Sequence, residues 1–149
     1  MDDTPIKTRS SALPGHLIRR LHQLSTRVFT EETRAAGFDL TPVQFVALDA
    51  LRENNGIDQA RLAEAIAKDR ATVGSVIDRL EQKGLIARQV SRRDKRAREL
   101  TLTDEGAALV AAMTPVVEAL QARILPGLTA HEYDQFIALA AKATAFAPE

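Results

Sequence analysis

A short stretch of the sequence is rich enough in arginine and lysine to bind a polyanion. Residues 88–98 read RQVSRRDKRAR and hold six basic residues against one acid, Asp94, a local charge of +5. Arginine binds phosphate oxygens and the O6 and N7 edge of guanine, so this composition favours contact with nucleic acid. A basic run can equally be a solvated loop, and its interpretation therefore depends on the segments that flank it.

The segment directly before the basic run predicts an amphipathic helix over residues 69–83. Asp69 can cap this helix, and Lys83 with Gly84 can end it. Apolar residues at i, i+3, i+4 and i+7 form one buried face: Val73, Val76, Ile77 and Leu80. The opposite face carries Arg70, Thr72, Ser75 and Arg79, with Gly74 beside them. Short polar and basic side chains of this kind suit a face that lies against another molecule.

Further helices are predicted around this one from hydrophobic spacing and capping residues. The first covers about residues 11–36, the second begins at Thr41 and stops at 54–56, and the third covers residues 58–66. A later helix begins at Thr103 and carries an apolar stripe as far as Ile124. The last helix begins at Thr129, and its predicted inward residues are Tyr133, Phe136, Ile137 and Ala140. Residues 85–90 and 98–102 alternate apolar and polar residues, which predicts a two-stranded hairpin with the basic run at its tip.

This order of elements predicts a mainly α fold with a small β wing, a winged helix-turn-helix. Residues 37–102 would form the DNA-binding region, and residues 1–36 with 103–149 a helical dimerisation region. The terminal helices carry wide apolar faces, and the rest of the chain is too short to bury them, which favours a homodimer.

A helix fits the major groove, which is about 12 Å wide, and its N-terminal half touches the bases. Arg70, Thr72 and Ser75 occupy that half. The hairpin would follow the adjacent backbone and insert an arginine into the minor groove. The predicted DNA contacts are Arg70, Thr72, Ser75, Arg79, Arg92, Arg93, Lys95 and Arg96.

Composition excludes several other kinds of protein. The chain has no cysteine and only three scattered histidines, so neither a disulfide nor a metal site nor a cofactor is expected. A net charge of zero argues against a protein that coats nucleic acid indiscriminately. Apolar stretches such as 107–117 are shorter than the ~20 residues of a membrane span, and residues 1–3 are not basic. We therefore expect a cytoplasmic protein that contacts no membrane.

Several motifs together resemble one known family. They are Leu40-Thr41-Pro42 with Phe45, Asp69-Arg70 at the start of the amphipathic helix, LEQKGLI at 80–86, Asp94-x-Arg96 at the hairpin tip, and LTDEG at 102–106. Residues 40–109 are in these respects similar to the multiple antibiotic resistance regulator (MarR) family of bacterial repressors. The resemblance implies a triangular homodimer in which the first, fifth and sixth helices intertwine and two winged domains read an inverted repeat of double-stranded DNA.

The same resemblance implies roles for two residues of the hairpin tip. Arg96 would reach the minor groove, and Asp94 would orient the wing through a salt bridge. Alternatively, Asp94 only relieves repulsion within the arginine cluster.

The first helix suggests a ligand site. Its Gly-His-Leu-x-Arg-Arg start at residues 15–20 resembles the subgroup of the family that responds to aromatic acids such as hydroxybenzoates. By that resemblance Arg19 would bind the carboxylate, with His16 and Arg20 as second choices and Phe38, Phe45 and Asp49 as walls. These residues can instead be solvated or form intersubunit salt bridges. The interpretation is thus a repressor that a small aromatic acid releases from DNA, although the sequence does not settle the direction of the effect.

Other functions fit less well. A different phenolic or lipophilic ligand remains open, and a winged helix can also serve as a protein-interaction module, although such modules tend to lack a strongly cationic wing. An architectural DNA binder should be more basic overall. Ser25 and His22 lie close in sequence, but no oxyanion hole, nucleophile elbow or metal motif accompanies them, so we expect no enzymatic activity.

Overall fold

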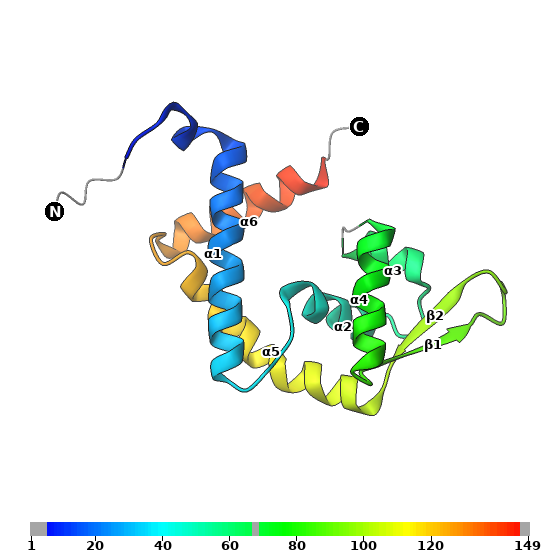
Figure 1. Cartoon of the computed structure of the whole chain (residues 1–149). Coiled ribbons are helices and arrows are strands. Elements are labelled where there is room, and N and C mark those ends of the chain that lie inside the picture. The colour runs from blue at the N-terminus through cyan, green and yellow to red at the C-terminus, as the bar shows by residue number, and fades with distance from the viewer. Residues whose placement is uncertain (1–5, 67–68, 147–149) are drawn as a thin grey trace. The chain divides into compact units, whose positions relative to one another are not determined.

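The computed structural model describes residues 6–66 and 69–146, and Lys68, expected in the turn before the amphipathic helix, lies outside the described residues. Its elements are η1 (Arg9–Ala12), α1 (Pro14–Ala35), α2 (Pro42–Glu53), α3 (Gln59–Ala65), α4 (Arg70–Gln82), β1 (Ile86–Val90), β2 (Arg98–Leu102), α5 (Asp104–Ile124) and α6 (Ala130–Ala145). Figure 1 shows the two strands side by side as a hairpin that follows α4 directly. The mainly α fold with one small sheet is as predicted.

The chain divides into two compact units. One spans residues 29–117, and the other combines the described parts of residues 1–28 and 118–149. Both boundaries fall inside long helices, α1 and α5. The last turns of α1 and most of α5 therefore pack with the helices and the hairpin of the 29–117 unit. The expected division at residues 36/37 and 102/103 concerns function and stays a prediction.

The helices begin at the predicted capping residues. Thr41 and Gln44 form a reciprocal capping box, in which the Gln44 N–H donates to Thr41 Oγ1 at 3.2 Å and the Thr41 N–H donates to Gln44 Oε1 at 3.0 Å. Asp58 caps α3 through the Arg61 N–H at 2.8 Å. Thr129 and Glu132 repeat the capping box at α6, and the Thr129 N–H lowers the pKa of the Glu132 carboxyl. These side chains satisfy backbone donors that a helix start leaves unpaired.

The hairpin is antiparallel, with Ile86 opposite Leu102 and Val90 opposite Arg98. A third segment, not predicted, pairs with the other edge of β2. The Gly56 N–H donates to the Leu100 carbonyl at 2.8 Å, and the Leu100 N–H donates to the Ile57 carbonyl at 2.9 Å. The loop between α2 and α3 thereby ties the hairpin to the helices.

The core of the 29–117 unit is apolar and closely packed. The rings of Phe29 and Phe45 lie 6.3 Å apart between centroids. Its fully buried side chains include Leu48, Leu51, Leu62, Val73, Ile77, Leu80, Leu100, Val110 and Met113. Val73, Ile77 and Leu80 confirm the predicted inward face of α4, although Val76 is only half-buried.

The prediction that α6 carries a buried face is wrong for the single chain. Tyr133, Phe136 and Ala140 are half-buried, and Ile137 is 48% exposed. Leu139, beside them, is 66% exposed. The periodicity of α6 identifies an apolar face correctly, but the chain does not provide enough apolar surface to cover it.

Helix α5 is the one described helix long and apolar enough to cross a membrane, with a mean hydropathy of 1.3 over its most apolar 18-residue window. Val110, Met113 and Leu120 of this helix are nevertheless fully or almost fully buried in the protein. We therefore interpret α5 as a core helix.

The start of α5 lies against the start of β1 with no space between them. The Thr103 hydroxyl donates to the Gly84 carbonyl at 2.7 Å and accepts the Gly106 N–H at 3.0 Å. A Cβ placed on Gly106 would lie 2.0 Å from the carbonyl oxygen of Leu85. Only glycine allows this approach of α5 to the backbone at the base of the hairpin.

We expect Gly106→Ala to destabilise the protein by about 2–3 kcal/mol, because its methyl group would clash with backbone that no rotamer change can move. Urea unfolding measures this loss. The matched control is Gly15→Ala in α1, where nothing lies within 4 Å and where alanine should be neutral or slightly stabilising. Equal stability of the two variants would contradict the proposed clash.

Candidate nucleic-acid interface

The exposed face of α4 is built from its capped N-terminus onward. Asp69 accepts the backbone N–H of Thr72 at 2.8 Å and the Thr72 hydroxyl at 2.7 Å. These bonds, the hydroxyl first, lower the pKa of the Asp69 carboxyl, so the cap stays ionised. The Thr72 hydroxyl is engaged by the capping Asp69, so its methyl group is the part of the side chain available for contact outside the helix.

The four predicted recognition residues, Arg70, Thr72, Ser75 and Arg79, are all exposed. Neither Arg70 nor Arg79 forms an ion pair with another residue of 6–66 or 69–146. The side chains between the two arginines project little from the helix, because the Ser75 hydroxyl donates back to the Ala71 carbonyl. Gly74 differs from the prediction: it is half-buried, and a Cβ there would lie 3.5 Å from Gln59 Nε2 of α3. Gly74 thus lies beside α3 rather than on the exposed face, and a methyl group there would make an ordinary van der Waals contact.

The hairpin tip is shaped by two short side chains. The buried Ser91 hydroxyl accepts the backbone N–H groups of Arg93 at 3.2 Å and Asp94 at 3.3 Å. Asp94 in turn accepts the Arg96 backbone N–H at 3.0 Å. Asp94 thus helps to hold the turn through a backbone hydrogen bond, and it forms no salt bridge with any residue that the structure describes. Its role in orienting the wing stays a prediction. The sequence analysis did not single out Ser91. The feature that could have identified it is its position, as a small hydroxyl residue between the end of a predicted strand and a charged turn.

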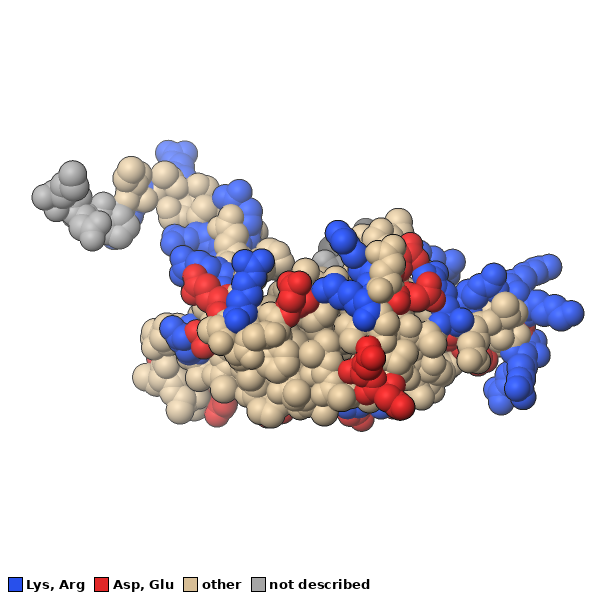
Figure 2. Space-filling model, turned by 60° about the horizontal axis from the view of Figure 1, so that its bottom comes forward, with Lys and Arg blue, Asp and Glu red and all other residues tan. Residues whose placement is uncertain are grey.

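The cations of the tip are free for contact with a partner. Arg92, Arg93, Lys95 and Arg96 are exposed, and Figure 2 shows the basic side chains gathered over the hairpin at one side of the view. Because backbone hydrogen bonds hold the turn, none of these four side chains is needed to shape it.

Arg88 does not belong to this free set. Its guanidinium binds Asp78 Oδ1 closely, and its Nε lies 3.4 Å from Glu81 Oε2, both on α4. Asp78 chiefly, and Glu81, raise the pKa of Arg88 above its usual value. The effective basic surface of the hairpin is therefore smaller than the sequence count suggests.

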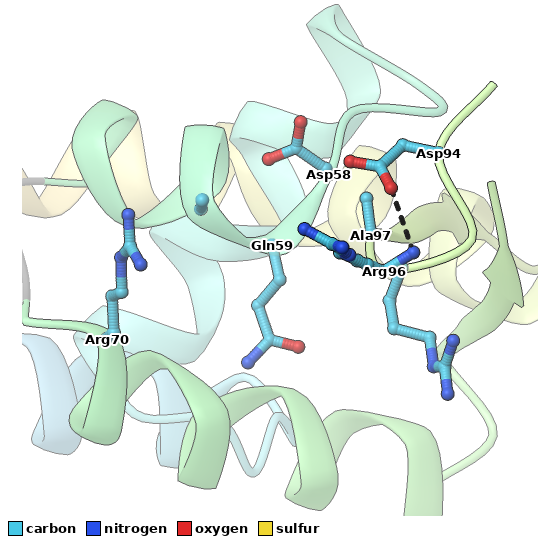
Figure 3. A pocket seen from close by; sticks show the side chains of 8 residues that line it. Asp58, Gln59, Arg70, Asp94, Arg96 and Ala97 are labelled. Carbon is cyan, nitrogen blue, oxygen red and sulfur yellow. Dashed lines mark hydrogen bonds between the residues drawn. The ribbon is translucent and has the colours of Figure 1, made fainter.

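A cavity of about 430 Å³ lies between the start of α3, the first residue of α4 and the wing. It is lined by Asp58, Gln59, Ala60, Arg70, Asp94, Arg96, Ala97 and Arg98. Figure 3 shows Gln59 reaching from the start of α3 toward α4, between Arg70 and Arg96. The cavity brings both predicted DNA-contacting surfaces to one hollow, with an amide between them that the sequence analysis did not single out.

The predicted ligand residues belong to different units. His16, Arg19 and Arg20 lie in the unit of 1–28 with 118–149, and Phe38, Phe45 and Asp49 lie in the 29–117 unit. Phe45 is buried against Phe29, and Asp49 pairs with Arg52. A separate groove of about 480 Å³ follows α1 and is lined by Leu17, Arg20, Leu21, Gln23, Leu24 and Arg27. No group of metal-ligating side chains is present in the part of the chain that the structure describes.

Known proteins share this arrangement. The sequence profile of the MarR family matches residues 40–97. The HTH-type transcriptional repressor NicR of Pseudomonas putida is 34% identical over 132 residues, which cover 89% of this chain and 81% of NicR. The chain belongs to the MarR family. The family membership confirms that this is a transcriptional regulator and not an enzyme.

Solved structures of MarR-family regulators confirm the winged helix-turn-helix. BpsR of Bordetella bronchiseptica, whose DNA binding is regulated by 6-hydroxynicotinic acid, superposes with a TM-score of 0.86 at 32% identity, covering 96% of this chain and all of BpsR. A mutant of MarR from E. coli, solved in complex with operator DNA, superposes with a TM-score of 0.81 at 27% identity, covering 93% of this chain and 99% of that one.

We expect Ser91→Ala to weaken DNA binding several-fold while lowering the melting temperature by only about 2–4 °C. The variant removes the acceptor for two N–H groups of an exposed turn, a local loss of about 1 kcal/mol. Hydrogen exchange at the amides of 93 and 94 should accelerate, and a gel-shift titration measures the affinity. Thr101→Ala, which alters a strand hydroxyl outside the tip, should leave both readouts unchanged. Unaltered exchange in Ser91→Ala would refute this role of Ser91.

Proposed function

We propose that this MarR-family protein is a repressor that binds an inverted-repeat operator as a homodimer and leaves it when a small aromatic carboxylate binds. The observation that supports this most strongly is the pair of basic surfaces, on α4 and on the wing tip, which border one cavity. Both surfaces belong to one compact unit, so they can meet a duplex together.

On DNA, α4 would enter the major groove and the wing tip would reach the adjacent minor groove. Arg70 at the start of α4 is suited to a guanine edge, and the Thr72 methyl to a thymine methyl. Arg96 is suited to a narrow, strongly negative minor groove. Ser75, Arg79, Arg92, Arg93 and Lys95 would contribute hydroxyl and phosphate contacts that set the position of the protein on the duplex.

A homodimer would explain the exposed apolar side chains on and next to the terminal helices. Leu13 is 56% exposed, Leu139 66% and Phe146 78%. A second copy supplies the matching surface, because a two-fold interface is self-complementary. Two winged units about one DNA turn apart, roughly 34 Å, would then match the two halves of a palindrome.

The effector proposal combines a charge with an apolar surface. The groove along α1 sets the guanidinium groups of Arg20 and Arg27 beside three leucines, which suits an aromatic ring that carries a carboxylate. BpsR responds to 6-hydroxynicotinic acid, itself a hydroxylated aromatic acid. A hydroxybenzoate is thus the proposed class, with Arg20 as its carboxylate contact in the groove. Of the other predicted ligand residues, Arg19 and His16 lie on the same helix, and Phe38, Phe45 and Asp49 lie in the 29–117 unit. The pairing of Asp49 with Arg52 makes Asp49 the weakest of these candidates.

The effector would act in the cytoplasm by favouring a conformation in which the two α4 helices no longer match the operator. Only a difference in affinity between two conformations can shift their populations. A coupling of about 1–3 kcal/mol weakens operator binding by roughly 5- to 150-fold.

For DNA binding, we expect Arg96→Ala to weaken operator affinity by about 1–3 kcal/mol. Arg70→Ala should do the same and also relax the preference at one base pair, because it removes a contact to a base edge. Gel-shift titrations compare the region upstream of the gene with scrambled DNA at matched salt. If the wild-type protein binds both duplexes equally, the repressor proposal fails.

For the effector, hydroxybenzoate should raise the melting temperature of the wild-type protein more than that of Arg19→Ala or Arg20→Ala, because each variant loses a carboxylate contact. Arg34→Ala, near the other end of α1, serves as the matched control. Thermal-shift assays over a range of hydroxybenzoate concentrations give the comparison. Identical shifts in all four proteins would remove both arginines from the site.

A further inference from the structure

The wing is joined to α4 by a side chain as well as at its base. Arg88 lies in the middle of β1, opposite Leu100 of β2. Its guanidinium reaches two carboxylates on α4, Asp78 and Glu81, which are one helical turn apart. These are the only ion pairs between the hairpin and α4 among residues 69–102.

Arg88 is more buried than the cations of the wing tip, which are all exposed. The Arg88 side chain is 22% exposed, whereas those of Asp78 and Glu81 are 60% and 46% exposed. Arg88 is therefore the most buried of the three, and the two carboxylates more than balance its single positive charge. A guanidinium held by two carboxylates offers little to a phosphate, so a direct DNA contact is a poor account of this arginine.

We propose that Arg88 is a positioning residue, which fixes the hairpin at the angle to α4 at which recognition helix and wing tip reach adjacent grooves together. This inference rests on the proposed mode of DNA binding. Partly exposed ion pairs contribute little to folding stability, so the cluster is not needed to hold the fold together. Its effect lies in geometry, because the distance between two grooves of a duplex is fixed and a mobile wing would reach its groove only part of the time.

The proposal predicts that removing one of these acids weakens DNA binding, which is the opposite of what a simple charge effect would give. Removal of an acid from a DNA-binding protein ordinarily strengthens the attraction of the polyanion. If Asp78 acts by holding Arg88, then Asp78→Asn should instead weaken binding to the upstream duplex, by about two- to fivefold, which is the most that a partly exposed ion pair can contribute. The matched control is Glu64→Gln on α3, an exposed acid in the same unit, which should bind as well as wild type or slightly better.

Two further variants separate positioning from other roles. Arg88→Gln should weaken binding to a similar degree, and the Asp78→Asn/Arg88→Gln double variant should bind no more weakly than Arg88→Gln alone. In an Arg96→Ala background, Asp78→Asn should cost much less, because the wing contact that it positions is already gone. Melting temperatures measured in parallel show whether each variant folds, and Asp78→Asn carries the test alone should Arg88→Gln fail to fold.

The outcomes distinguish this inference from the proposed function. Equal or tighter binding by Asp78→Asn, in a wild-type background that prefers the upstream duplex, overturns the positioning role and leaves the repressor proposal intact. Additive effects of Asp78→Asn and Arg96→Ala overturn it as well. If wild type does not discriminate between the upstream and scrambled duplexes, the proposed function itself has failed and the positioning role fails with it.

Discussion

The close approach of two backbone segments, at Leu85 and Gly106, holds the DNA-binding unit together. The end of α4, the start of β1 and the first turn of α5 meet there, and the Thr103 hydroxyl bridges them by donating to the Gly84 carbonyl and accepting the Gly106 N–H. The Thr103 N–H adds a bond of 3.1 Å to the Leu85 carbonyl. Because the recognition helix ends at this crossing and the wing starts from it, any displacement here would be transmitted to both.

The parts of the fold that depend on local chemistry could be predicted from the sequence. Thr41, Asp58, Asp69 and Thr129 cap helices in the structure as expected, because a capping side chain and its acceptor N–H groups lie within three residues of each other. The inward face of α4 followed equally well from its spacing. The family motifs then connected these elements into a winged helix-turn-helix, which the solved relatives confirm.

The parts that depend on distant residues could not be predicted in the same way. Arg88 looks like one more cation of the basic run, and only the fold shows that Asp78 and Glu81 neutralise it. Gly74 was placed on the recognition face, but its neighbour is Gln59 of another helix. The face of α6 shows a third limit: a hydrophobic period indicates which residues seek burial, whereas burial itself depends on whether a surface exists to receive them.

In the hairpin tip, the residues that shape the turn are different from the residues that are exposed for contact. Ser91 and Asp94 fold the turn by accepting N–H groups of the main chain, and every amino acid except proline supplies such a group at positions 93 and 96. Positions 92, 93, 95 and 96 can therefore exchange side chains over evolutionary time without rebuilding the loop. A substitution at one of these positions would alter what the tip touches and leave its shape, which depends on Ser91 and Asp94, in place.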